Sequence, residues 1–164
     1  MTRPTLSRRR VLGSAGVAIA GAFAGCNDVG GGGEPEYEDG EVGNVDGEAR
    51  SAEQMAAAEA LAEQEVNEGV TPLDVLTIQN HEFVLEDNYL GSTVQGTVEN
   101  TGEDRIEIVE VRVRVYDETG TQLGQYLDVT GDLAGNTTWN FQVVILEPPA
   151  DIADYEIAVL GTPS

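Results

Sequence analysis

The strongest constraint on the fold is an alternation of apolar and polar side chains that begins near Leu73 and continues to the C-terminus. A period of two residues is the pattern of β-strands with one buried face. Gly, Asn, Asp and Pro, which favour turns, separate the alternating segments. The expected strands are 81–86, 93–100, 106–116, 122–129, 137–145 and a last one that carries Tyr155, Ile157 and Val159. Six or seven short antiparallel strands predict an all-β domain over residues 73–164, folded as a two-sheet β-sandwich.

The longest expected strand, 106–116, changes phase along its length. Its isoleucines occupy even positions at Ile106 and Ile108, whereas Val109 and the three valines that follow it at every second position are odd. One extra residue in a strand shifts the phase of all side chains beyond it, so we expect a β-bulge near Val109. On strand 137–145, Trp139 is in phase with Phe141 and Val143, which predicts a core position.

The same region resembles the FxLYD domain family. Val113-Arg114-Val115-Tyr116-Asp117 with Gly120 is similar to the strand and turn that give the family its name. Gly96-Thr97-Val98-Glu99-Asn100 resembles the family's preceding motif, and Leu133-Ala134-Gly135 with Phe141 resembles the following one. Val113, Val115 and Ala134 replace the Phe, Leu and Pro of the family pattern. The resemblance, over about residues 75–161, implies an immunoglobulin-like fold on exported lipoproteins, including those of halophilic archaea, and it implies no catalytic residues.

Residues 51–69 are expected to form one short helix before the strands. Ser51 and Gln54 have the spacing of a capping box, alanines that favour helix follow, and Gly69 can end the helix. Met55, Ala58, Ala62 and Val66 share a narrow stripe. Two interpretations stay open, a helix packed on the sandwich or on a partner helix, and a solvated spacer.

The first 25 residues have the three parts of an export signal. An arginine-rich start is followed by a stretch of small apolar residues, 11–24, and by Gly25 before a cysteine. This apolar stretch is shorter than the roughly 20 residues that a helix needs to cross a bilayer. Arg8 and Arg9, between Ser7 and an apolar pair, resemble the twin-arginine consensus, so residues 1–25 are expected to be a twin-arginine-type lipoprotein signal peptide. The alternative is a general-secretion signal that is rich in arginine.

Cys26 is the one cysteine of the chain, so an intramolecular disulfide is excluded. Phe23-Ala24-Gly25-Cys26 resembles a lipobox, in which the thiol of the mature first residue carries a lipid. Two alkyl chains anchor a protein stably, because each buried CH₂ contributes about 0.8 kcal/mol. We therefore expect lipidation at Cys26 and a position on the extracellular face of the cell membrane; the alternative is an inert cysteine in an uncleaved helix.

Residues 26–50 are rich in Gly and acidic side chains, which predicts a disordered tether. Cleavage before Cys26 would remove four of the eight basic residues and no acidic one, which leaves four basic against 30 acidic residues and a net charge of −26. The chain has no lysine. This composition suits high-salt surroundings, where charge repulsion is screened; an acidic protein of moderate salinity is the alternative. A nucleic-acid partner is disfavoured, because phosphate contacts need a basic surface.

The side chains that carry chemistry are few. His81 is the one histidine, which is too few for the usual zinc or blue-copper ligand sets, so it is expected to be structural. Acidic pairs such as Asp117-Glu118 leave calcium binding open without an EF-hand spacing. Asn136-Thr137-Thr138 is a sequon for N-glycosylation. Arg112 and Arg114 are expected on the outward face, where carboxylates of neighbouring strands such as Glu99 could pair with them. No metal or cofactor is expected.

The sequence as a whole predicts a non-enzymatic, lipid-anchored surface protein that displays an interaction or structural module to a partner in the cell envelope. The alternative is an extracytoplasmic lipoprotein component that binds a solute or a cation.

Overall fold

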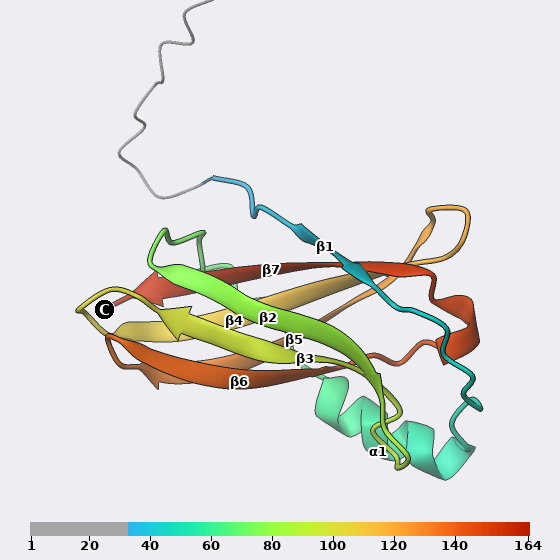
Figure 1. The fold of residues 1–164 in the computed structure, drawn as a ribbon. Helices are drawn as coiled ribbons and strands as arrows, with labels where there is room; N and C mark the ends of the chain where they lie inside the picture. The colour runs from blue at the N-terminus through green and yellow to red at the C-terminus, as the bar shows by residue number, and fades with distance from the viewer. Residues whose placement is uncertain (1–32) are drawn as a thin grey trace, which may run out of the picture.

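The computed structural model describes residues 33–164, which form two antiparallel β-sheets packed face to face (Figure 1). One sheet has the order β1-β7-β4-β5 and the other the order β2-β3-β6. The strands are β1 (Glu38–Glu41), β2 (Leu76–Leu85), β3 (Ser92–Asn100), β4 (Ile106–Tyr116), β5 (Gln122–Leu133), β6 (Thr137–Val144) and β7 (Asp154–Pro163). The expected all-β sandwich of six or seven strands is confirmed.

The arrangement of β2 to β7 is that of an immunoglobulin-type Greek key. In immunoglobulin sandwiches the first, second and fifth strands share one sheet, and the third, sixth and seventh strands share the other. Here β2, β3 and β6 form the first of these sheets, β4 and β7 take the third and sixth positions in the second, and β5 pairs with β4 at the edge of that second sheet. The edge position beside β7, which the last strand of such a domain usually fills, is taken by β1 from the N-terminal side of the chain.

The core lies between the sheets and consists largely of valine and isoleucine. The inward-facing valines of β4, from Val109 to Val115, have no exposed surface, and Ile106 at the start of the strand is also buried. The register of β4 on β7 slips between Ile106 and Ile108, so the bulge exists but lies earlier than the expected position at Val109. Burying side chains of this size stabilises the fold by about 1.5 to 3 kcal/mol each.

The helix α1 (Ala52–Ala62) begins as expected, with a capping box between Ser51 and Gln54. It ends at Ala62 and not near Gly69. Acidic residues follow at Glu63 and Glu65 and no basic residue lies in the last turn, which is unfavourable at the negative end of the helix dipole. Ala58 is fully buried and α1 contacts β6, so the helix packs on the sandwich. Val66 lies beyond the helix and is exposed.

The expectation of a disordered tether over residues 26–50 is wrong for its described part, residues 33–50. Glu38–Glu41 pair with β7, and Val42 is buried in the core. The segment ends at Arg50, whose guanidinium donates to the carbonyls of Tyr89 (3.0 Å) and Leu90. The sandwich therefore starts well before residue 73.

The segment after α1 also belongs to the domain. Val70 is buried, and Thr71 exchanges two backbone hydrogen bonds with Gly161 of β7, both of 2.9 Å. On the opposite flank, a carboxylate oxygen of Asp128 on β5 accepts a hydrogen bond of 2.9 Å from the backbone N–H of Gln142 on β6. The short 3₁₀-helix η1 (Pro149–Asp151) connects β6 with β7.

Candidate functional site

The expected export and lipidation residues, Arg8, Arg9 and Cys26, lie outside the described residues, as does the whole of 1–25. The N-glycosylation sequon, 136–138, lies within the described residues. Asn136 is exposed on the turn between β5 and β6, with a left-handed backbone (φ 57°). Its N–H donates to the carbonyl of Gly102 (3.0 Å), and Thr138 of the sequon is also exposed. The structure thus brings the sequon to an accessible turn.

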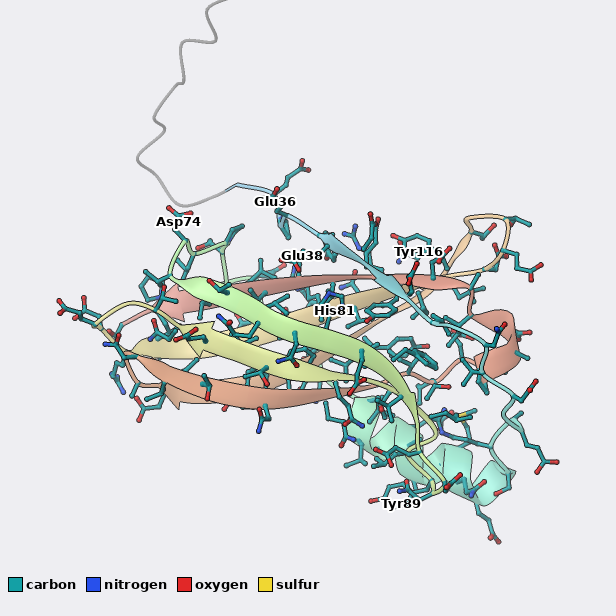
Figure 2. The ribbon with its side chains drawn as sticks, in the orientation of Figure 1. Glu36, Glu38, Asp74, His81, Tyr89 and Tyr116 are labelled. Carbon is teal, nitrogen blue, oxygen red and sulfur yellow. The ribbon has the colours of Figure 1, made fainter. Side chains whose placement is uncertain are left out.

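His81 on β2 connects the two sheets. Its Nδ1 lies 2.7 Å from the hydroxyl of Tyr155 on β7, and the two rings meet edge to face with centroids 5.6 Å apart. Its Nε2 lies 3.8 Å from a carboxylate oxygen of Glu38 on β1, and Figure 2 shows these two residues beside each other. Of the domain's serines, Ser92 is buried with an unpartnered hydroxyl and Ser164 donates to the carbonyl of Arg105. His81 therefore sits in a cross-sheet contact, and neither Ser92 nor Ser164 is hydrogen-bonded to it.

Tyr155 is the central side chain of this contact. Only 2% of its surface is exposed, and burial, with the nearby Glu82 carboxylate, raises the pKa of its phenol to about 12. Its ring packs against the backbone of β1 at Gly40, where a Cβ would lie only 2.1 Å from the ring. Glycine at this position allows β1 to approach.

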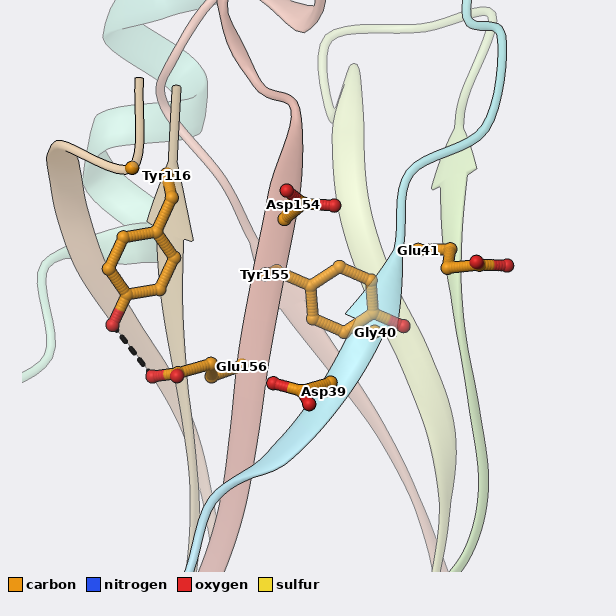
Figure 3. Close-up of a pocket in the computed structure, with 8 residues that line it drawn as sticks. Asp39, Gly40, Glu41, Tyr116, Asp154, Tyr155 and Glu156 are labelled. Atoms are coloured by element: carbon orange, nitrogen blue, oxygen red, sulfur yellow. Dashed lines mark hydrogen bonds between the residues drawn. The ribbon is translucent and has the colours of Figure 1, made fainter. Parts of the chain in front are cut away.

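An open groove of about 430 Å³ lies along β1 and β7, and we call it the acidic groove (Figure 3). Four carboxylates line it, together with two tyrosines and two glycines: Asp39, Glu41, Asp154, Glu156, Tyr116, Tyr155, Gly40 and Gly120. The hydroxyl of Tyr116 donates to Glu156 (2.6 Å), and this hydrogen bond raises the pKa of Tyr116. The groove is suited to cations in charge, but among residues 33–164 no three His, Cys, Asp or Glu side chains converge to hold a metal ion.

The expected pairing of Arg112 and Arg114 with Glu99 is wrong. Glu99 lies on β3 in the other sheet and accepts a hydrogen bond from Gln79 (2.6 Å). Arg112 instead pairs with Glu110 of its own strand. The guanidinium of Arg114 lies 4.0 Å from the centre of the Tyr37 ring, in a cation–π contact.

Glu110 is a buried carboxylate that the sequence did not single out. Its side chain has no exposed surface, although it alternates out of phase with the core valines of β4. The segment after α1 covers it, because the N–H of Asn67 donates to its Oε2 (3.0 Å) while the carbonyl of Asn67 accepts from Arg112 (3.1 Å). This buried pair holds the segment onto the sheet, so its role is structural.

Asp128 on β5 is an acidic residue that is partly buried, and this burial raises the pKa of its carboxyl. The backbone N–H groups of Gln142 and Val129 both donate to it, each at 2.9 Å. It closes the flank between β5 and β6.

Within residues 33–164, no helix has the length and apolar character needed to span a membrane.

Comparison with known proteins gives one relative of this chain. An uncharacterized protein of Methanocaldococcus jannaschii is 32% identical to it over 84 residues. The matched stretch is 50% of this chain and 62% of that protein, so the chain spans less than two thirds of its relative. No family model matches the chain, and no solved structure matches it. The likeness assigns no activity, ligand or partner.

Proposed function

We propose that this chain is a non-enzymatic, lipid-anchored protein of the extracellular membrane face, which displays its β-sandwich as an interaction or structural module. One observation supports this most: β1 fixes the chain to the sandwich at Glu38, only 12 residues after Cys26. Twelve residues span at most about 43 Å when fully extended. A lipid on Cys26 would therefore hold the sandwich close to the membrane surface.

The proposal includes membership of the FxLYD family and a habitat of high salt. The family's strand and turn correspond to β4 and the turn at Asp117, where Asp117 accepts hydrogen bonds from the N–H groups of Thr119 (2.8 Å) and Thr121 (2.9 Å). The exposed acidic side chains and the absence of lysine support the habitat, because concentrated salt screens their repulsion.

The partner in this proposal is a protein of the cell envelope, which binds to strand edges or loops of the sandwich. Nucleic acid does not fit as a partner, since the mature chain would carry four basic against 30 acidic residues.

A second candidate function is the binding of a solute or a cation, and the acidic groove favours it. Four carboxylates around about 430 Å³ would attract a positively charged ligand. A rise in melting temperature with Ca²⁺ or an organic amine, at constant ionic strength, would support this candidate. Co-purification of one envelope protein without such a rise would support the displayed module.

The anchoring part is tested in a halophilic host by cell fractionation of wild type, Cys26→Ser, and Arg8→Lys with Arg9→Lys. We expect wild type in the membrane fraction and sensitive to protease added to whole cells. Cys26→Ser should leave the membrane, and the paired Arg→Lys variant should stay inside the cell. Arg3→Lys, which keeps the charge outside the consensus, is the matched control and should behave as wild type. Wild type in the cytoplasm would contradict the proposal.

A further inference from the structure

The register of β1 on β7 places acidic residues directly opposite each other. Asp39 faces Glu156 and Glu41 faces Asp154 across the ladder, and all four side chains line the acidic groove. Residues directly opposite in an antiparallel pair have Cβ atoms about 4.5 to 5.5 Å apart, and like charges in such pairs are destabilising. Repulsion between the acidic side chains of β1 and those of β7 therefore opposes the pairing of the two strands.

Other contacts of the same segment favour docking. Gly40 packs on the ring of Tyr155, Glu38 lies 3.8 Å from His81, and the ring of Tyr37 lies under the guanidinium of Arg114. β1 is an edge strand of four residues, and β7 is the one strand with which it pairs in the sheet. The free energy of docking is therefore a small difference between favourable packing and unfavourable charge repulsion.

The two like-charge pairs differ in their surroundings. Glu156 also faces Arg114 across the β4–β7 ladder, so a positive charge lies beside the pair that it forms with Asp39. Asp154 faces Tyr116 across the same ladder, so the pair with Glu41 has no cation opposite it. Repulsion at Glu41 is consequently the less compensated of the two.

We propose that residues Tyr37–Glu41 form a salt-dependent strap, which docks on β7 in concentrated salt and is released in dilute salt. The Debye length falls from about 8 Å at 0.15 M to about 3 Å at 1 M, and this range includes the Cβ separation of about 4.5 to 5.5 Å for residues directly opposite in such a ladder. The equilibrium between the docked and the released strap therefore depends on the ionic strength of the surrounding solution. This inference rests on the described register and holds with or without a lipid at Cys26.

Release of the strap changes the surface of the sandwich. It uncovers the backbone N–H and C=O groups of β7 that pair with β1, and the face of the Tyr155 ring that Gly40 covers. An unpaired strand edge accepts another extended segment. In concentrated salt the strap therefore covers the edge of β7, to which another extended segment could otherwise add as a strand.

Hydrogen exchange of the full-length chain, purified from the membrane in detergent, tests the strap at about 0.15 M and about 1 M salt. We expect the amides of 38–41 and their β7 partners to exchange about threefold or more faster in dilute salt. Amides in the centre of β3 and β4 serve as the internal reference, because partial loss of the whole fold would accelerate them as well.

Three variants distinguish repulsion between the carboxylates of β1 and β7 from a general loss of stability of the fold. Glu41→Gln should remove most of the salt dependence of β1 exchange, and Asp39→Asn should remove less. Glu38→Gln is the matched control: it also removes one negative charge from β1, but Glu38 lies opposite Ile157 and not opposite an acid, so the variant should keep the salt dependence. Equal exchange of β1 at both concentrations in wild type, a change only in step with β3 and β4, or an unaltered salt dependence in Glu41→Gln would overturn the proposal.

Discussion

At the scale of single residues, contacts that cross between segments decide how the sandwich closes. Asn100, at the end of β3, is fully buried and donates to the carbonyls of Asp104 (2.8 Å), Leu133 and Ala134 (3.2 Å each). Turn-favouring residues are expected between strands 93–100 and 106–116, and the N–H of Gly102 donates to the Asn100 side chain (3.0 Å) in this turn. What the sequence could not indicate is which distant carbonyls a buried amide satisfies, because that depends on loops brought together only by the fold.

Gly40→Ala tests the contact between β1 and Tyr155. A Cβ at this position would lie 2.1 Å from the ring, so we expect β1 to undock and the free energy of unfolding to fall by about 1 to 3 kcal/mol. Gly33→Ala is the control, since a Cβ there meets nothing within 4 Å. Denaturant unfolding in concentrated salt measures both. Equal stability of the two variants would contradict the close packing at Gly40.

Tyr155 predicts how stability depends on alkaline pH. Its folded pKa of about 12 lies above the ordinary value of 10.0, so the fold favours the neutral phenol. Its contribution is fully present below pH 10 and is lost as the pH rises toward 12. The melting temperature of wild type at constant salt should therefore fall steeply in this range.

Tyr155→Phe is the corresponding variant, and its melting temperature should fall less between pH 10 and 12 than that of wild type. Part of the slope should remain, because Tyr126 has a pKa raised to about 12 by burial and by Glu147. Identical slopes in wild type and Tyr155→Phe would show that Tyr155 does not titrate with unfolding.

At the scale of elements, the sequence predicted what strong periodicity specifies. The bounds of β4 agree with the expected 106–116, and the phase change along it corresponds to a real slip in register. β1 escaped prediction, because four residues rich in acid and glycine have no alternating pattern and gain their strand conformation from the edge of β7. Tyr37, Val42 and Val45 were the available signal, since they are apolar residues in an otherwise acidic segment.

Trp139 shows the limit of periodicity within a correctly predicted strand. It is in phase with Phe141, as expected, but it is only partly buried at the margin of the core, whereas Phe141 is buried. Alternation identifies the inward face of a strand, and the position along the sandwich decides how deep a side chain lies.

Arg50 fastens the N-terminal segment to the end of the sandwich. Its guanidinium donates to the carbonyls of Tyr89, Leu90, Ser92 and Leu146. Arg50→Lys replaces this planar donor by an ammonium that cannot reach all of these carbonyls, so we expect a loss of about 2 kcal/mol. Arg105→Lys, at an exposed ion pair with Asp132, should cost less than about 1 kcal/mol. Chemical denaturation compares them, and similar losses would argue against the anchoring role.

At the scale of the whole molecule, the proposed function depends on the charge of the chain and on its attachment at Cys26. The fold class followed from the sequence because alternation recurs over the whole domain, while the N-terminal boundary did not. The acidic groove was also beyond prediction, because two of its carboxylates come from β1 and two from β7, segments more than 100 residues apart in the chain. A sandwich lined with such charges fits display in concentrated salt.

The intact mass of the protein from the membrane fraction of a halophilic host tests the central claim most directly. We predict a polypeptide that begins at Cys26 and carries the added mass of a lipid on that residue. Release of the lipid-bearing N-terminal peptide by protease would locate the modification. A mature protein that begins elsewhere, or one with an unmodified Cys26, would contradict the account of a lipid-anchored surface module.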